Sequence, residues 1–305
     1  MKRSSPRNPS ARHSPRRAGG GQVRIGVIGG SGVYDLEGLT DVREVRLRTP
    51  FGAPSDAIRV GRYGGIQVAF LPRHGRGHRI LPTEINFQAN IFALKMIGVE
   101  QIIAISACGS LKEEIRPGDF VIPSQLFDRT KSRPWTFYGE GVVGHTSFAD
   151  PFCGTLSERL HKASQALGFT AHLGGTYVCI EGPMFSTRSE SKVYRSYGFD
   201  IIGMTGIPEA RLAREAEICY ATVGMVTDYD VWMEGREVTA QEVMLTFANN
   251  VGRAKDLLGK VLPGLERTRT CPCASAAKDV VITAREALPA KRLRALAPIL
   301  GRYFT

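Results

Sequence analysis

The chain has 305 residues, of which 43% are apolar and 23% are charged. This composition is typical of a globular protein that buries a sizeable core. No apolar run is long enough to cross a membrane and the N-terminus lacks the apolar stretch of a secretory signal, so we expect a cytoplasmic protein without a membrane partner. The six cysteines include no C-x-x-C pair, which argues against a zinc finger or ribbon, and we expect no metal and no organic cofactor.

The formal net charge of +11 suggests a nucleic-acid partner, but the charge is unevenly distributed. Residues 1–20 hold six basic and no acidic side chains, and residues 266–305 hold eight basic and three acidic ones. Residues 21–265 carry 26 side chains of each sign. We therefore predict a disordered basic tail over 1–22 and a basic extension over 266–305. Nucleic-acid binding through these ends is one alternative function, although aromatic residues occur there only at the very end of the chain.

Short apolar runs rich in β-branched residues predict strands over 22–28, 66–71, 101–107, 119–123, 176–180, 200–204 and 218–227. Helical patterns and end signals predict helices over 83–97, 156–167, 190–197, 208–216 and 240–262. Thr239 and Glu242 form the capping-box pattern ahead of the last helix. Strands alternate with helices, which indicates an α/β fold: a single domain over 23–265 with a mixed, mainly parallel central β-sheet flanked by helices.

The C-terminal extension carries two further signals. Residues 280–302 predict a helix, broken at Pro289 and Pro298, that packs on the domain or on a neighbouring subunit. Cys271 and Cys273 form a C-x-C pair, whose spacing is shorter than that of the usual zinc motifs. A redox or disulfide role for this pair stays open.

Polar residues and glycines follow several of the predicted strands, at 29–32, 73–75, 106–110, 204–206 and 227–230. In α/β sheets, ligands bind beyond the carboxyl ends of the strands. We therefore expect these five segments to contribute to one site.

The first two of these segments suit an anion. The glycine loop at 29–32 offers backbone N–H groups, but it matches neither the dinucleotide fingerprint nor the Walker loop, and a simple tight turn is the alternative. Arg73 offers a planar fork that matches phosphate, and His74 offers a second donor. A charged surface turn is the alternative interpretation for these two residues.

The last segment suits proton transfer. Asp228 and Asp230 lie two residues apart at the end of an apolar strand, so their side chains point the same way. Partial burial there raises a carboxyl pKa and supplies a proton donor. An ordinary turn pair is the alternative interpretation.

Taken together, these segments resemble the 5′-methylthioadenosine phosphorylase branch of the trimeric purine nucleoside phosphorylases. The resemblance spans about residues 23–262. It rests on ordered motifs that include IGVIGGSG (25–32), PRHGRGH (72–78), SACGSLKEEIRPGD (106–119), IEGPMFSTRSES (180–191) and TDYDVW (227–232). What it implies is reversible phosphorolysis of 5′-methylthioadenosine to adenine and 5-methylthioribose 1-phosphate, a step of purine and methionine salvage. The partners are then a small nucleoside and inorganic phosphate as co-substrate, with no nucleic acid.

The resemblance also implies residue roles. The phosphate-binding positions are Ser31, Arg73, His74, Ser106, Ala107 and Thr205. The nucleoside-binding positions are Phe185, Met204, Asp228, Tyr229, Asp230, Val243 and Met244, with His145 reaching in from a neighbouring subunit. Asp228 is the catalytic candidate, facing purine N7, and Asp230 helps to read the amino group. Carboxylates at these positions favour adenine, while adenosine, inosine or methylthioinosine stay alternative substrates.

For the assembly, the resemblance implies a homotrimer or a dimer of trimers. The C-x-C pair resembles that of the hexameric, disulfide-containing branch. Cys153 and Cys219 are one candidate intrasubunit disulfide pair on that basis.

Overall fold

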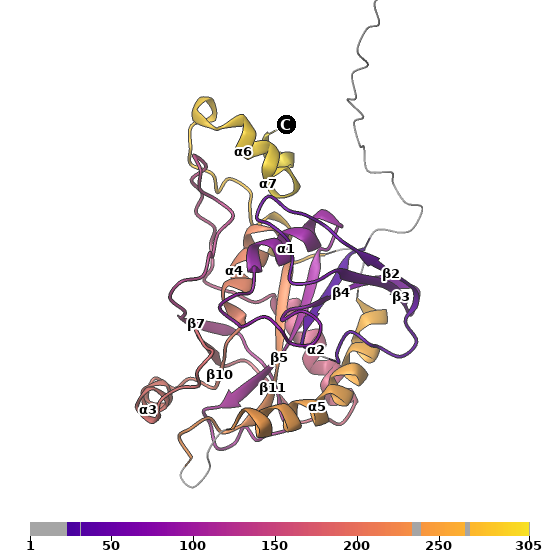
Figure 1. Cartoon of the computed structure of the whole chain (residues 1–305), viewed down its shortest axis with the longest axis vertical. Coiled ribbons are helices and arrows are strands. Elements are labelled where there is room, and N and C mark those ends of the chain that lie inside the picture. The colour runs from indigo at the N-terminus through magenta and orange to yellow at the C-terminus, as the bar shows by residue number, and fades with distance from the viewer. Residues whose placement is uncertain (1–22, 31, 234–238, 266–268, 305) are drawn as a thin grey trace, which may run out of the picture.

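The computed structural model describes residues 23–30, 32–233, 239–265 and 269–304 (Figure 1). The predicted disordered tail over 1–22 and the loop residue Ser31 lie outside the described residues. The strands are β1 (Ile25–Gly29), β2 (Thr40–Val45), β3 (Ile58–Tyr63), β4 (Ile66–Pro72), β5 (Gln101–Ser110), β6 (Phe120–Ile122), β7 (Gln125–Arg129), β8 (Ala171–Leu173), β9 (Thr176–Ile180), β10 (Ile201–Gly203) and β11 (Cys219–Asp228).

These strands form one sheet in the order β2-β3-β4-β1-β5-β10-β9-β7, with β11 paired to β5 and β6, and β8 paired to β6. Among the described residues, six of the ten strand pairings are parallel. The predicted mixed, mainly parallel sheet is therefore confirmed.

Helices cover both faces of the sheet (Figure 1). They are α1 (Phe87–Met96), α2 (Gly154–Ala166), α3 (Arg188–Ser196), α4 (Gly206–Glu215), α5 (Ala240–Val261), α6 (Ala290–Ala295) and α7 (Ala297–Phe304). Neighbouring strand residues point to opposite faces: Val27 packs in the cluster with α2 and α5, whereas Ile28 packs in the cluster with α1, α4 and α7. Within the described part of the chain, no helix has both the length and the apolar character needed to cross a membrane.

The predicted helix ends are partly correct. Helix α5 begins after Thr239, and the capping box of Thr239 with Glu242 is present. The helix predicted from residue 83 begins instead at Phe87, because Asn86 is the N-cap and its Oδ1 accepts a hydrogen bond from Ala89 N at 2.9 Å.

The C-terminal extension packs on its own domain. Leu296, Ile299 and Leu300 are buried in the same cluster as α1. In place of the one helix predicted over 280–302, the structure has a 3-10 turn over Arg285–Ala287 and the two short helices α6 and α7. Pro298 lies within the first turn of α7, where a missing N–H costs no hydrogen bond, so it begins that helix rather than breaking it.

The six cysteines are all free thiols in this structure. The candidate Cys153–Cys219 disulfide is therefore absent, which corrects that expectation. The sulfur atoms of this pair lie close to those of Cys271 and Cys273. Cys219 Sγ is 3.2 Å from Cys271 Sγ, which is longer than a disulfide bond of about 2.05 Å.

The sheet opens at its centre. Residues 101–104 of β5 pair with β1, while Gly109 and Ser110 of the same strand pair with β10. Because β11 follows β5 along its other edge, β1 and β10 share one edge of β5 and diverge from each other. The loops that follow β1, β4, β10 and β11 meet around this opening.

Candidate active site

A cavity of about 420 Å³ lies at the opening of the sheet. Its volume lies within the usual range of small-molecule sites. Among the predicted site residues, those that line it are Arg73, His74, Ser106, Ala107, Phe185, Met204, Thr205, Asp228, Asp230, Val243 and Met244. The five strand-end segments were expected to meet, and residues from each of them line this cavity.

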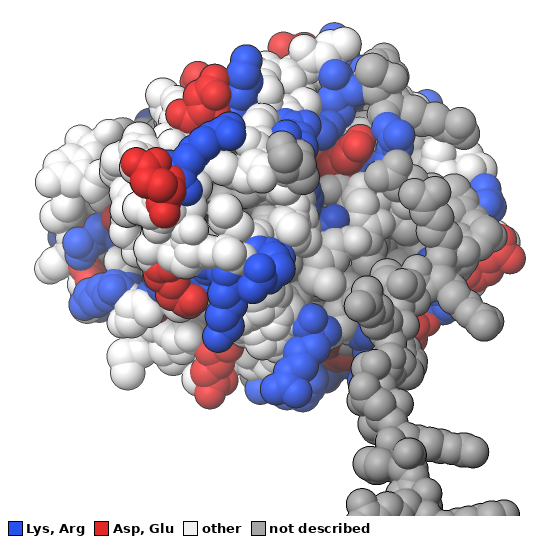
Figure 2. Space-filling view, turned by 90° about the horizontal axis from the view of Figure 1, so that it is seen from above, with Lys and Arg blue, Asp and Glu red and all other residues white. Residues whose placement is uncertain are grey.

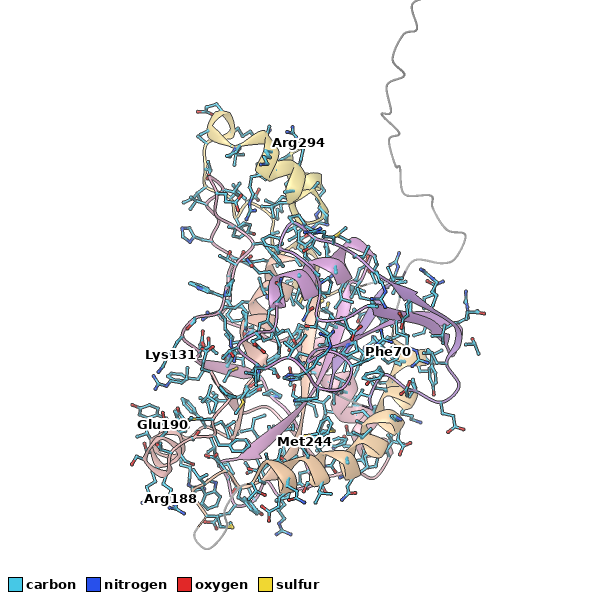
Figure 3. All side chains as sticks on the ribbon, viewed as in Figure 1. Phe70, Lys131, Arg188, Glu190, Met244 and Arg294 are labelled. Carbon is cyan, nitrogen blue, oxygen red and sulfur yellow. The ribbon has the colours of Figure 1, made fainter. Side chains whose placement is uncertain are left out.

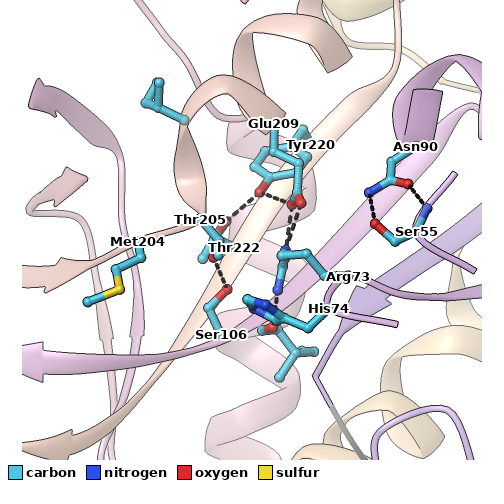
Figure 4. A network of polar contacts seen from close by, with 12 residues as sticks. Ser55, Arg73, His74, Asn90, Ser106, Met204, Thr205, Glu209, Tyr220 and Thr222 are labelled. Atoms are coloured by element: carbon cyan, nitrogen blue, oxygen red, sulfur yellow. Dashed lines mark hydrogen bonds and ion pairs between the residues drawn. The ribbon is translucent and has the colours of Figure 1, made fainter. Parts of the chain in front are cut away.

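Two hydroxyls from different strand ends meet at the polar part of the cavity. Ser106 Oγ on β5 lies 3.1 Å from Thr205 Oγ1, which directly precedes α4 (Figure 4). Both side chains are almost fully buried. Each hydroxyl has one proton, so one of them donates to the other and the second keeps its proton free to donate to an anion.

Arg73 follows β4 and is paired with a residue that the sequence analysis did not identify. Its Nε donates to Glu209 Oε1 at 2.7 Å, its Nη2 donates to Glu209 Oε2 at 2.9 Å, and its Nη1 donates to the Ile105 carbonyl at 3.1 Å (Figure 4). Burial opposes the charge, but the Glu209 carboxylate holds the pKa of Arg73 above its usual value. The remaining two of its five N–H groups have no acceptor among the described residues.

His74 is a neutral acceptor rather than the expected second donor. Its Nδ1 lies 2.8 Å from the Ile80 carbonyl, and a carbonyl only accepts, so Nδ1 carries the proton. Burial and then the charge of Arg73 lower the pKa of His74 to about 4. At neutral pH, Nε2 of His74 therefore carries a lone pair that can accept a hydrogen bond from the hydroxyl group of a monohydrogen phosphate.

The two predicted carboxylates lie together at the end of β11. Asp228 Oδ1 accepts from Asp230 N at 2.8 Å, and Asp228 Oδ2 accepts from Thr227 Oγ1 at 2.7 Å. Burial raises the pKa of both Asp228 and Asp230 above the ordinary aspartate value. Asp230 Oδ2 is buried without a hydrogen-bond partner among the described residues. A buried oxygen of this kind is costly unless a ligand donates to it.

A local irregularity of β11 places Asp228. The pairing with β5 shifts register between Val226 and Asp228, so that Asp228 pairs with Gly109. A side chain at Gly109 would begin 2.9 Å from Asp228 Oδ1 and 3.0 Å from Ile202 Cγ2. The absence of a Cβ at Gly109 therefore makes room for the carboxylate.

The apolar part of the cavity is lined by Phe185, Met204, Val243 and Met244. Val243 and Met244 come from the first turn and a half of α5, where Figure 3 labels Met244. Phe185 lies in the segment between β9 and α3 and is 40% exposed. These side chains offer contact area but no hydrogen bond, which suits an apolar substituent of a ligand.

Two predicted residues do not line this cavity. Tyr229 points away, because its hydroxyl donates to the Glu113 carbonyl at 3.4 Å and its ring packs against Trp232. His145 is exposed in a loop whose backbone N donates to the Val280 carbonyl at 3.0 Å. The expected role of His145 requires a neighbouring subunit.

Besides Glu209, two further residues that the sequence analysis missed support or line the site. Arg133 is buried and donates from Nη1 to the carbonyls of Met204 and Ile207 at 2.6 and 2.7 Å, which fixes the loop that carries Thr205. Ser186 lines the cavity, and its hydroxyl is buried without a partner among the described residues. Neither residue has a local sequence signal, because an arginine or a serine in a polar loop is usually exposed to solvent. Only the folded structure shows that these two lie at the site.

Comparison with known proteins places this geometry in context. The family model described as the phosphorylase superfamily matches residues 24–263. The chain is 52% identical over 284 residues to the S-methyl-5′-thioadenosine phosphorylase of Koribacter versatilis, covering 93% of this chain and 97% of that protein. It is 53% identical over 281 residues to the enzyme of the same name from Geobacter sulfurreducens, covering 92% and 98%.

Solved structures of methylthioadenosine phosphorylases are also similar to this chain. A methylthioadenosine phosphorylase sourced from an Antarctic soil metagenomic library superimposes with a TM-score of 0.87 and 43% identity, covering 92% of this chain and all of that one. The methylthioadenosine phosphorylase of Schistosoma mansoni in complex with adenine superimposes with a TM-score of 0.76 and 39% identity, covering 80% and 93%.

Proposed function

The chain belongs to the phosphorylase superfamily, and on that premise we propose that it catalyses the reversible phosphorolysis of 5′-methylthioadenosine. An oxygen of inorganic phosphate attacks the ribose C1′, the C1′–N9 bond breaks, and adenine leaves with a proton on N7. The products are adenine and 5-methylthioribose 1-phosphate. The observation that carries the proposal is one cavity that holds both an anion-binding group of side chains and two buried carboxylates.

Arg73, His74, Ser106 and Thr205 bind the phosphate in this proposal, and Ala107 adds backbone beside them. The two N–H groups of Arg73 and the one hydroxyl proton of the Ser106–Thr205 pair that is not used between them donate hydrogen bonds to phosphate oxygens, while His74 Nε2 accepts a hydrogen bond from the phosphate hydroxyl. Glycosidic cleavage passes through an oxocarbenium-like state. A dianion held below C1′ stabilises that positive charge and is already positioned to attack.

Asp228 assists the departing purine. Burial raises its pKa, which favours the protonated carboxyl group that donates to N7 in this proposal. The leaving base gains electron density at the imidazole ring as the C1′–N9 bond breaks. Proton donation there lowers the barrier in the way of general acids.

Asp230 and Ser186 suit an amino purine. The unpartnered Oδ2 of Asp230 accepts a hydrogen bond from an exocyclic amino group, which a keto oxygen cannot supply. Burying this acceptor against a keto purine leaves it unpaired, and such mismatches discriminate strongly. The proposed preference is therefore for adenine over hypoxanthine as the leaving base.

Val243 and Met244 suit the 5′ substituent. A methylthio group is apolar and packs against these two side chains without losing a hydrogen bond. The 5′-hydroxyl of adenosine would lose its hydrogen bonds to water against the same two side chains and gain none in return. The proposed order of preference is therefore methylthioadenosine before adenosine.

We extend the proposal to a homotrimer or a dimer of trimers in the cytoplasm, with His145 completing the 5′ end of the neighbouring site. Val143 and Ile282 lie beside this loop, are joined by a backbone hydrogen bond, and are 48% and 65% exposed. Exposed apolar side chains in one place are typical of an interface. Light scattering measures the mass, and mixing His145→Ala with Asp228→Asn chains restores activity if the sites are shared.

Nucleic-acid binding is not favoured by the charge pattern on the face shown in Figure 2. On the face shown in Figure 2, Lys and Arg side chains are interspersed with Asp and Glu side chains among the described residues. Continuous basic stripes are the usual footprint of nucleic-acid binders.

A substrate panel tests the proposed specificity. Purine release is measured with methylthioadenosine, adenosine, inosine and methylthioinosine at saturating phosphate. The proposal expects the highest kcat/KM with methylthioadenosine. A higher value for either keto purine contradicts the roles of Asp228 and Asp230.

A further inference from the structure

Four cysteines gather outside the active site. The sulfur atoms of Cys153, Cys219, Cys271 and Cys273 all lie within 4.8 Å of one another. They come from three distant parts of the chain: the N-cap of α2, the first residue of β11, and the C-x-C pair of the extension. Three are buried and Cys271 is half-buried.

We propose that these four cysteines bind one Zn²⁺ ion in a closed tetrahedral thiolate site. Zinc–sulfur bonds are about 2.3 Å long, which places the sulfur atoms of a tetrahedron about 3.8 Å apart. In this structure Cys219 Sγ lies 3.2 Å from Cys271 Sγ, and all four sulfur atoms lie within 4.8 Å of one another. Small side-chain movements complete the geometry. On binding, the thiols release their protons to solvent.

The convergence of four sulfur atoms favours a metal over disulfides. A disulfide needs only two sulfur atoms, at about 2.05 Å, and two disulfides have no reason to share one centre. Here every sulfur is near every other. Four thiolates in a closed tetrahedron are one of the usual ligand sets of structural zinc sites.

The surroundings suit the charge of such a site. One divalent ion with four thiolates carries two negative charges. Arg214 Nη1 lies 3.5 Å from Cys273 Sγ, within reach of a hydrogen bond to a ligating sulfur. Arg159 and Arg269 line a small cavity beside Cys153, Cys219 and Cys271. Partners of this kind orient ligands and strengthen metal binding.

The C-x-C spacing is shorter than the C-x-x-C spacing of the usual zinc motifs, in which two such local pairs supply the four ligands. In this fold the two other ligands come from α2 and β11, and so the spacing rule does not apply. The site would fasten the extension to the domain on the face where Cys153, Cys219 and Cys273 already pack in one cluster with residues of α2 and α5. Its role is therefore structural.

The test uses the full-length chain, expressed with zinc in the medium and purified with a thiol reductant. Elemental analysis is expected to find about one zinc per chain. Thiol titration of the denatured protein with a chelator is expected to find all six cysteines reduced. Cys271→Ser and Cys153→Ser should each weaken zinc retention at least about tenfold, whereas Cys179→Ser, a buried cysteine outside the cluster, should retain it.

Cobalt substitution on the wild-type chain keeps the test decisive if these variants fail to fold. Co²⁺ added to chelator-treated protein should give the intense visible bands of a tetrahedral thiolate complex. The proposal is overturned by wild-type protein that holds no zinc and gives no such bands, whether its thiols are free or paired as disulfides. It is equally overturned if folded Cys271→Ser and Cys153→Ser bind zinc as tightly as wild type.

Discussion

The Glu209 carboxylate binds the Arg73 guanidinium through two hydrogen bonds, Nε–Oε1 at 2.7 Å and Nη2–Oε2 at 2.9 Å. Both side chains are almost completely buried, at 2% and 0% exposure. The Tyr220 hydroxyl also donates to Glu209 Oε2 at 2.8 Å. The cation proposed to bind phosphate is therefore fixed from behind by a carboxylate from α4, and only part of its N–H fork faces the cavity.

Glu209→Gln should weaken both the fold and phosphate binding. Removing the carboxylate charge leaves the Arg73 guanidinium buried without a counter-charge, which costs about 3 kcal/mol of unfolding free energy. A less firmly held Arg73 should raise the KM for phosphate about tenfold. Denaturant unfolding and initial rates at varied phosphate measure the two effects.

The matched control is Glu44→Gln. Glu44 pairs with Arg46 and Arg76, and the three side chains are 42%, 76% and 47% exposed. Exposed pairs contribute little, so stability and phosphate KM should hardly change. Equal losses in Glu209→Gln and Glu44→Gln would show that the buried pair has no special role.

Gly109→Ala should displace the catalytic carboxylate. The new Cβ would lie 2.9 Å from Asp228 Oδ1, closer than carbon and oxygen approach, and Asp228 or β10 must move. We expect kcat/KM for the nucleoside to fall at least about tenfold, with a loss of stability of about 1–3 kcal/mol. Gly252→Ala is the control, because its Cβ meets no heavy atom within 4 Å and alanine favours the helix. Unchanged kinetics in Gly109→Ala would contradict the placement of Asp228.

Asp228→Asn should reduce turnover and alter the choice of purine. An amide cannot deliver a proton to N7, so kcat for adenine nucleosides should fall by about 10²- to 10⁴-fold. The amide N–H can donate to a keto purine, so the ratio of kcat/KM should shift toward inosine and methylthioinosine. Asp279→Asn, an exposed position in the extension, is the control. A uniform loss without any shift in the ratio would count against Asp228 as the discriminating residue.

Glu215 should make stability depend on pH. Burial raises the pKa of Glu215 to about 7, although Phe137 N and Thr136 Oγ1 donate hydrogen bonds to it. The folded chain then holds a proton that the unfolded chain has lost. This contribution is complete below the unfolded pKa of 4.5 and is lost as the pH rises through 7.

Glu215→Gln removes this titration. The fall in unfolding free energy between pH 5 and pH 8 should be smaller in the variant than in the wild type, by on the order of 1–3 kcal/mol. Chemical denaturation at the two pH values measures the difference. Parallel pH profiles for the two proteins would show that Glu215 ionises normally in the fold.

The sequence predicted the elements with strong local signals. The capping box of Thr239 and Glu242 marks the start of α5, and the apolar runs of β5 and β11 stand out because both faces are buried. Strand β2 was missed because its side chains are almost all exposed and mostly charged or polar. An edge strand gains its structure from its neighbour, which local sequence does not reveal.

The site residues also divide into those with a local sequence signal and those without one. Arg73 and Asp228 follow recognisable strand ends, so the resemblance and the topology both indicated them. Glu209 lies 136 residues from Arg73, within a helix pattern where an acidic residue reads as solvated. Tyr229 shares its neighbours' motif but points away from the cavity, where its hydroxyl donates to the Glu113 carbonyl and its ring packs against Trp232.

The central claim is that phosphate, held at Arg73, His74, Ser106 and Thr205, is the nucleophile. The most direct measurement follows both products from methylthioadenosine as the phosphate concentration is varied. The predicted result is adenine release that saturates with phosphate, with one 5-methylthioribose 1-phosphate formed for each adenine. Equally fast release in phosphate-free buffer, with free 5-methylthioribose as the sugar product, would contradict it.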